Sequence, residues 1–196
     1  MTDSLQHRVA LFGGSFNPPH VCHTLATLWV LQTQRVDRVW WIPTYQHAFD
    51  KALTPFEDRV AMCELAIEKL HSVEINRVEH ELGGESRTID TVTYLQKKHP
   101  ELRFSLVVGA DILEEAPRWK NWEGLMELVD LIVVGRKGYV QETGPQIIDL
   151  DLPDISSTMI RRVLAEGRYE SILDWIPHRV LDFISSHHLY RDQEGQ

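Results

Sequence analysis

Residues 9–23 decide the fold and read Val9-Ala10-Leu11-Phe12-Gly13-Gly14-Ser15-Phe16-Asn17-Pro18-Pro19-His20-Val21-Cys22-His23. The apolar run predicts a buried strand, the glycine pair predicts a turn, and His20 lies where a helix opens. A glycine pair lets the backbone approach a phosphate closely, because no Cβ stands in the way. The free N–H groups and the dipole of the following helix favour the same anion. His20 and His23 fall on one helix face, where both can contact one phosphate chain. This segment predicts a nucleotide site.

Strand-like and helix-like segments alternate along the rest of the chain. Expected strands cover residues 8–12, 38–42, 73–78, 104–108 and 131–134, and expected helices cover 20–34, a segment opened by Pro55, 88–98, and a tail after Ser156 that breaks at Gly167 and restarts after Pro177. Strands separated by helices imply βαβ units and a parallel sheet. We therefore expect an α/β fold with a Rossmann-like, doubly wound parallel sheet, helices on both faces and a helical C-terminal part. One domain is expected to span residues 1–196.

Composition limits the classes of partner. The 196 residues carry a net charge of −9, which argues against binding of a nucleic-acid polymer by electrostatics alone. The N-terminus shows no secretory signal, and no apolar window approaches the length of a membrane span. Two cysteines, Cys22 and Cys63, form neither a disulfide framework nor a four-ligand zinc site. We expect a cytoplasmic protein with reduced thiols, no membrane partner and no protein-held metal, and assembly as a homo-oligomer is left open.

Three glycine-containing loops follow predicted strands, at residues 13–23, 109–111 and 135–137. Ligands of parallel sheets bind at the carboxyl ends of the strands, where these loops converge. The Gly-x-Gly-x-x-Gly fingerprint and the Gly-Lys-Ser/Thr motif are both absent after the first strand, which disfavours a Rossmann dehydrogenase and a P-loop NTPase. Asp111 has the chemistry to accept hydrogen bonds from a ribose diol, or to cap the next helix, and both roles are compatible.

A second polar motif reads Asp154-Ile155-Ser156-Ser157-Thr158-Met159-Ile160-Arg161-Arg162. Either Ser156 or Ser157 can cap the helix that starts there, while the remaining hydroxyls and Arg161 face an anion. The bland interpretation is a capped helix with a surface arginine. Earlier in the chain, Trp119 and Trp122 lie in a polar loop, so at least one of them is expected to stack on a flat partner, although a tryptophan is more often a core residue.

The first motif, Gly-Gly-Ser-Phe-Asn-Pro-Pro-His-x-x-His, resembles the signature of the nucleotidylyltransferase superfamily, which usually ends in His-x-Gly-His. The second motif resembles the superfamily's Ile-Ser-Ser-Thr-x-Ile-Arg signature. Residues 8–190 resemble the nicotinate/nicotinamide mononucleotide adenylyltransferases, most closely the bacterial nicotinate enzymes. Besides the two motifs, this resemblance rests on Trp119 and on residues 86–88, 109–111, 135–139 and 188–191. Two features depart from that pattern. Cys22 replaces the usual glycine of His-x-Gly-His, and residues 47–51 carry an aromatic and acidic insertion in a short basic stretch.

The resemblance implies in-line attack of a pyridine mononucleotide phosphate on the α-phosphorus of ATP, with release of pyrophosphate. It implies catalytic roles for His20, His23 and Arg161, ATP contacts for Gly13, Gly14, Ser15, Phe16, Gly109, Asp111, Arg136, Ser157 and Thr158, and mononucleotide contacts for Thr88, Trp119 and Lys51. Trp119 would stack on the pyridine ring, and Lys51 would contact the mononucleotide phosphate. Mg²⁺ would be held mainly by ATP oxygens and water, because this ion dehydrates reluctantly.

Several alternatives stay open at the level of sequence. The acceptor is expected to be nicotinate mononucleotide, but nicotinamide mononucleotide, or both, would fit the same residues. Less favoured are a nucleotidylyltransferase for another phosphate acceptor and a non-catalytic nucleotide sensor. A class I aminoacyl-tRNA synthetase is disfavoured because the chain is acidic and too short for a tRNA-binding domain.

Overall fold

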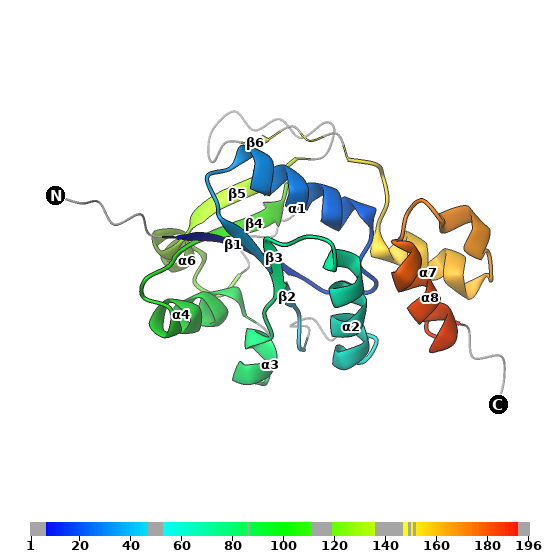
Figure 1. Cartoon of the computed structure of the whole chain (residues 1–196). Helices are drawn as coiled ribbons and strands as arrows, with labels where there is room; N and C mark the ends of the chain where they lie inside the picture. Colours follow the sequence, from blue (N-terminus) through cyan, green and yellow to red (C-terminus); the bar gives the residue numbers. More distant parts are fainter. Residues whose placement is uncertain are drawn as a thin grey trace.

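The order of strands confirms a doubly wound parallel sheet. The computed structural model describes residues 7–46, 53–85, 87–110, 119–135, 147–148, 150 and 152–191. Six strands pair in parallel in the order β3-β2-β1-β4-β5-β6 (Figure 1). Their bounds are β1 Arg8–Gly14, β2 Arg38–Pro43, β3 Val73–Ile75, β4 Arg103–Gly109, β5 Asp130–Val134 and β6 Ile147–Ile148. The order reverses between β1 and β4, and ligands of this architecture bind at that switch point.

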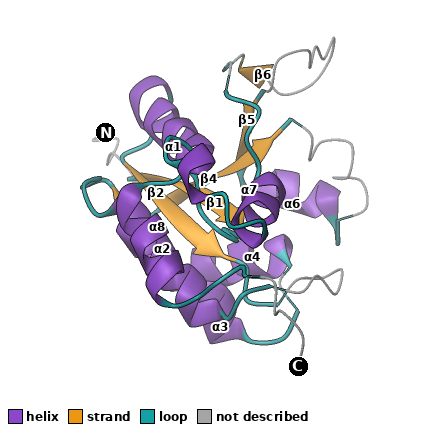
Figure 2. Cartoon of the chain, turned by 90° about the vertical axis from the view of Figure 1, so that its right-hand side faces the viewer, coloured by secondary structure: helices purple, strands orange, loops and turns teal. Residues whose placement is uncertain are grey.

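Helices cover both faces of the sheet, as expected. The described helices are α1 Val21–Thr33, α2 Phe56–Ile67, α3 Val78–Leu82, α4 Thr88–Lys98, α6 Trp122–Leu128, α7 Ser157–Ala165 and α8 His178–Ser186, with a 3-10 turn η2 at Tyr169–Ile172. Helices α1 and α2 lie on one side of the sheet, and α4 and α6 lie on the other (Figure 2). Within the described residues, no helix has the length and apolar character needed to cross a bilayer.

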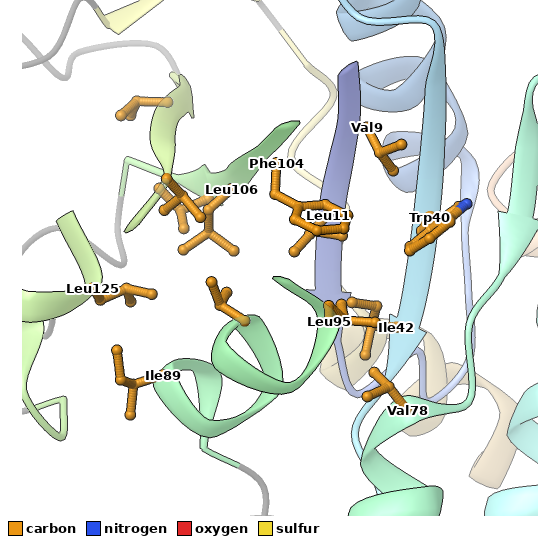
Figure 3. Close-up of a cluster of buried hydrophobic side chains, with 14 of the residues drawn as sticks. Val9, Leu11, Trp40, Ile42, Val78, Ile89, Leu95, Phe104, Leu106 and Leu125 are labelled. Carbon is orange, nitrogen blue, oxygen red and sulfur yellow. The ribbon is translucent and has the colours of Figure 1, made fainter. Parts of the chain in front are cut away.

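The two faces of the sheet contribute side chains to two separate hydrophobic cores, because successive side chains along a strand point to opposite faces. Val9, Leu11 and Leu106 point toward α3, α4 and α6, where they join the cluster drawn in Figure 3. Ala10 and Val107, on the opposite face, pack against α1 and α2. The carboxyl ends of all these strands consequently meet at one edge, between two rigid layers.

The helical C-terminal part forms a third core with α2 and the first turn of α1. Met62 of α2 and Cys22 of α1 pack with apolar residues of α7, η2 and α8. The Cys22 sulfur also lies 3.4 Å from the carbonyl oxygen of Pro153. The C-terminal part is therefore fixed against α2 and the first turn of α1.

Two local expectations were wrong or incomplete. The predicted strand at 73–78 ends at Ile75, because the Asn76 side chain accepts the N–H of Val78 at 3.0 Å and turns the chain into α3. The polar loop around Trp122 becomes helix α6, which starts where the Asn121 side chain accepts the N–H of Gly124 at 3.3 Å. An asparagine at that position is a standard helix cap.

Candidate active site

The loop after β1 is shaped by close packing. The Phe16 side chain is 1% exposed and stacks on Trp41, with ring centroids 4.7 Å apart and planes at 10°. Its backbone has a φ of +45°, a left-handed conformation that surrounding contacts must hold in place. A Cβ on Gly14 would come within 3.3 Å of the Phe16 ring, whereas a Cβ on Gly13 would meet nothing within 4 Å. Gly13 thus leaves open space beside the backbone, as a phosphate-binding turn requires.

His20 and His23 lie side by side at the start of α1, as their spacing predicts. Their ring centroids are 3.9 Å apart, and the His20 ring is buried. The backbone N–H of His20 donates to Nδ1 of His23 at 3.1 Å. Because Nδ1 accepts this bond, the proton of a neutral His23 ring resides on Nε2, which is then a hydrogen-bond donor.

The second motif contacts the first across the switch point. Ser156 is the residue that caps α7, since its hydroxyl accepts the N–H of Met159 at 3.2 Å. The Ser157 hydroxyl is thereby left to donate to the carbonyl of Pro18 at 2.9 Å. Arg161 donates to the carbonyl of Asn17 at 2.8 Å and to the Thr158 hydroxyl at 3.2 Å. The histidines and the Ser-Thr-x-x-Arg residues consequently border one loop.

A cavity of about 440 Å³ opens beside this loop, at the carboxyl ends of β1, β2 and β4. Its lining includes the apolar side chains of Leu11, Ile42, Val92, Leu106 and Val108. It is also lined by Trp119, by Gly13, Gly14 and Gly109, and by the polar residues Ser15, Thr44, Glu79, Glu85, Arg87, Thr88, Thr91 and Lys120. A cavity with both apolar and polar groups in its lining suits a flat, partly polar ligand.

The N-terminus of α4 supplies hydrogen-bond donors to this cavity. Thr88 and Ile89 occupy the first two positions of the helix, where backbone N–H groups have no partner within the helix. Thr91, one turn further, is 4% exposed, and its hydroxyl has no hydrogen-bond partner in the described part of the chain. Sequence reasoning singled out Thr88 and missed Thr91. The available signal was the spacing of three residues, which places both threonines on one helix face.

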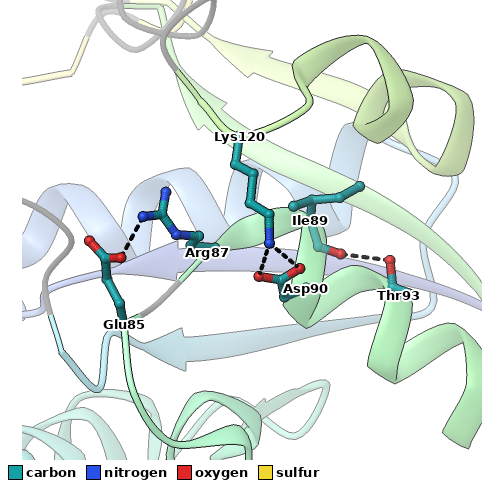
Figure 4. Close-up of polar contacts among 6 residues, drawn as sticks. All are labelled: Glu85, Arg87, Ile89, Asp90, Thr93 and Lys120. Carbon is teal, nitrogen blue, oxygen red and sulfur yellow. Dashed lines mark hydrogen bonds and ion pairs between the residues drawn. The ribbon is translucent and has the colours of Figure 1, made fainter.

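Exposed ion pairs surround the same helix terminus (Figure 4). The Lys120 ammonium lies 2.9 Å and 3.0 Å from the two carboxylate oxygens of Asp90. Arg87, which precedes the helix, pairs with Glu85 and makes no side-chain cap. The Lys120 ammonium offsets the negative charge of Asp90, which lies in the first turn of α4. The repulsion between this carboxylate and an anion at the helix terminus is thereby reduced.

Trp119 combines the two roles that sequence reasoning treated as alternatives. It lines the cavity, and it also packs against the hydrophobic core between the sheet and α4 that Figure 3 draws. Trp122 meets it edge to face, with centroids 5.8 Å apart and planes at 87°. The two tryptophans therefore do not stack on each other, and Trp119 also contacts the cavity.

The structure brings together some of the predicted residues and leaves others undescribed. Gly13, Gly14, Ser15, Thr88, Gly109 and Trp119 border the cavity, while His20, His23, Ser157, Thr158 and Arg161 form a separate group at the starts of α1 and α7. The predicted contacts of Asp111, Arg136 and Lys51 lie outside the described residues. Cys22, which replaces a glycine of the resembled motif, packs in the C-terminal core.

Comparison with known proteins points in one direction. Residues 11–163 match the profile of the Cytidylyltransferase-like family. A protein of Anaeromyxobacter dehalogenans with the name "Probable nicotinate-nucleotide adenylyltransferase" is 47% identical over 186 residues, covering 93% of this chain and 96% of its own length. The corresponding Bacillus pumilus protein is 36% identical over 188 residues, with 93% and 98% covered.

A solved structure supports the same architecture. The nicotinic acid mononucleotide adenylyltransferase of Plasmodium falciparum, solved in complex with NaAD, superposes with a TM-score of 0.81. The superposition covers 94% of this chain and 97% of that one, at 21% sequence identity. At this level of identity the likeness concerns the fold.

Proposed function

This chain belongs to the nicotinate-nucleotide adenylyltransferase family, and we propose that it transfers the adenylyl group of ATP to nicotinate mononucleotide, giving nicotinate adenine dinucleotide and pyrophosphate in NAD synthesis. One observation carries the assignment of residues. The cavity bordered by Trp119 and the α4 terminus adjoins the loop that His20 and His23 share with Ser157 and Arg161. Two ligands can therefore meet at the switch point.

The cavity suits the pyridine end of the mononucleotide. Trp119 offers an aromatic surface, the backbone N–H groups of Thr88 and Ile89 offer two donors, and Thr91 lines the cavity with its hydroxyl buried. A carboxylate can accept from such donors, and it also gains from the positive end of the helix dipole. A neutral carboxamide lacks that electrostatic gain. The terminus therefore favours nicotinate over nicotinamide.

The histidine side of the loop suits the triphosphate of ATP. A donor at Nε2 of His23, the neighbouring His20 ring and the Arg161 guanidinium can stabilise negative charge on the phosphate chain. Ser157 and Thr158 lie at the N-terminus of α7, where N–H groups favour the leaving pyrophosphate. We assign Gly13, Gly14, Ser15 and Phe16 backbone contacts with ATP, and Gly109 a contact with the ribose.

The chemistry needs positioning more than a protein nucleophile. An oxygen of the mononucleotide 5′-phosphate forms the new bond to the α-phosphorus, and the bond from that phosphorus to the bridging oxygen breaks. Pyrophosphate leaves with the bonding electron pair. Charge stabilisation and orientation supply most of the acceleration in such transfers. His20, His23 and Arg161 are the groups that this chain offers for that purpose.

Magnesium is a proposed cofactor that ATP itself would hold. In the described part of the chain, no three His, Cys, Asp or Glu side chains are grouped closely enough to bind a metal. Coordination by phosphate oxygens and water suits Mg²⁺, because this ion dehydrates reluctantly. Such an ion screens the charge of the triphosphate when bound. Asp111 at the ribose, Arg136 near the adenylate, Lys51 at the mononucleotide phosphate and a cytoplasmic location remain proposals from the sequence.

Pyrophosphate release tests the proposed function. The protein is mixed with ATP and Mg²⁺, and with nicotinate mononucleotide, nicotinamide mononucleotide or 4′-phosphopantetheine in separate reactions. We expect rapid release with the nicotinate compound and slower release with the amide. Release with phosphopantetheine alone would move the chain to another branch of the superfamily. Silence with all three acceptors, while ATP still binds, would instead support a nucleotide sensor.

A further inference from the structure

Arg59 is a cation in the interior of the protein. It lies in α2 on the same helix face as Cys63, and its side chain is 1% exposed. Its Nε donates to the carbonyl of Thr54 at 2.9 Å, and one of its terminal nitrogens donates to the carbonyl of Ser15 at 2.9 Å. Burial lowers the pKa of this guanidinium. Both of these hydrogen-bond partners are neutral backbone groups.

A buried charge whose hydrogen-bond partners are neutral adds little to the stability of the fold. Removing a guanidinium from water is costly in free energy, and an apolar side chain of similar size often stabilises a protein interior equally well. What the guanidinium provides, and an apolar side chain does not, is a rigid planar donor that fixes two carbonyls in one geometry. Here one of those carbonyls belongs to Ser15 of the β1 loop.

Tyr190, four residues after α8 ends, holds the same loop from another direction. Its hydroxyl donates to Oδ1 of Asn17 at 2.6 Å, and it shares a hydrogen bond with Thr54. Asn17 is itself 2% exposed. Arg59 and Tyr190 therefore meet at Thr54 and reach two positions of the loop, Ser15 and Asn17, that are two residues apart.

These contacts fix the direction of the loop. Arg59 reaches the loop from α2, which covers the same sheet face as α1, the helix that begins beside His20 and His23. Fixing the carbonyl of Ser15 also fixes the direction of the Phe16 N–H, because both groups belong to one planar peptide unit. This part of the loop is thereby held in one conformation, so that little reorganisation is needed when the substrate arrives.

We propose that Arg59 and Tyr190 are positioning residues that hold the β1 loop, through the Ser15 carbonyl and the Asn17 side chain, in the conformation in which it contacts the phosphates of ATP. Neither residue lines the cavity. The role rests on the proposed adenylyl transfer, because it assigns the loop to ATP. It predicts that loss of either contact lowers kcat and raises the KM for ATP, while the KM for the mononucleotide changes little.

The test uses full-length variants with matched controls. Arg59→Lys keeps the charge but loses the planar fork, Arg59→Met removes both donors, and Tyr190→Phe removes only the hydroxyl. Arg77→Met is the control for Arg59, because both guanidinium groups lie 5.5 Å from the Phe56 ring and only Arg59 reaches the loop. Tyr169→Phe is the control for Tyr190, as Tyr169 packs in the same C-terminal core.

We expect kcat/KM for ATP to fall about tenfold or more in Arg59→Met, since small losses of orientation are costly in transfer reactions. The kcat/KM of Arg59→Lys for ATP should lie between the values of Arg59→Met and the wild type, and that of Tyr190→Phe should be severalfold below the wild type. Hydrogen exchange of the peptide covering residues 13–17 should accelerate in these variants and stay unchanged in Arg77→Met and Tyr169→Phe. Equal kinetics and equal exchange in variants and controls would overturn the positioning role.

The two proposals fail in different ways. If the wild-type protein makes no dinucleotide, the proposed function is wrong, and loop exchange still measures the contacts of Arg59 and Tyr190. If the wild type is active and Tyr190→Phe and Arg59→Lys both match it, the function stands and the positioning role is wrong.

Discussion

His20 donates its backbone N–H to Nδ1 of His23 at 3.1 Å, so the second histidine caps the helix that begins between them. This bond makes Nε2 the protonated nitrogen of a neutral His23 ring. The spacing of the two histidines thus serves the helix and the site together. A substitution at His23 has to separate these two effects.

Replacing His23 by alanine should lower kcat by about 10² or more, the scale for loss of one preorganised charge-stabilising donor. His23→Asn is the informative companion, because its side-chain oxygen can still accept the capping N–H. We expect His23→Asn to regain thermal stability relative to His23→Ala and to remain poorly active. Steady-state kinetics and thermal melting separate the effects. A fully active His23→Asn protein would remove His23 from the catalytic residues.

Trp119 should matter for one substrate only. Trp119→Ala should raise the KM for nicotinate mononucleotide about tenfold, since stacking on an aromatic side chain contributes roughly 1–3 kcal/mol. The KM for ATP should change less than about threefold on the same scale. Trp119→Phe, which keeps a flat ring, should recover most of the affinity. Equal increases in both KM values would show that Trp119 is purely structural.

Thr91 offers a substitution that should separate stability from binding. Its buried hydroxyl has no hydrogen-bond partner in the described part of the chain, so Thr91→Val should leave the melting temperature unchanged or raise it. The same change removes a buried donor beside the cavity and should raise the KM for nicotinate mononucleotide severalfold. Thr93→Val is the control, because the Thr93 hydroxyl donates to the carbonyl of Ile89 at 2.7 Å within the helix. A Thr91→Val enzyme with unaltered KM would exclude this hydroxyl from the binding site.

Cys22 should contribute to stability and not to turnover. Its side chain packs in the C-terminal core, although it replaces a glycine of the motif. Cys22→Gly should cost about 1–2 kcal/mol in the free energy of unfolding, from lost burial and the low helix propensity of glycine. Cys22→Ala should cost less, and kcat should stay within about twofold of the wild type in both. Denaturant unfolding and kinetics check this, and a large rise in kcat for Cys22→Gly would show that the sulfur hinders the site.

Much of the fold was predictable because its signals are local. The apolar run at 9–12 and the alternation of helix and strand patterns determine a parallel sheet, and Thr88–Lys98 is a helix with the predicted ends. Val78 was misassigned because the Asn76 side chain ends the strand, a short-range polar bond that hydrophobic patterning does not contain.

The site was predictable where a motif marks it and less so where only the fold assembles it. Thr91 lines the cavity together with Trp119. The two residues lie in segments that are distant in the sequence, and only the folded chain brings them to one cavity. Arg59 and Tyr190 act on a loop far away in the sequence, and a lone charge on the apolar face of α2 was the available signal. The sequence pattern shows that a charge on an apolar helix face needs a hydrogen-bond partner, but only the tertiary structure shows which residue is the partner.

Transfer of an intact adenylyl group to nicotinate mononucleotide is tested most directly with ATP labelled at the α-phosphorus. The labelled ATP is mixed with the protein, Mg²⁺ and nicotinate mononucleotide, and the products are separated. We predict that the label appears in nicotinate adenine dinucleotide, with unlabelled pyrophosphate in equal amount. Label recovered only in AMP, or in unreacted ATP, would contradict the proposed reaction.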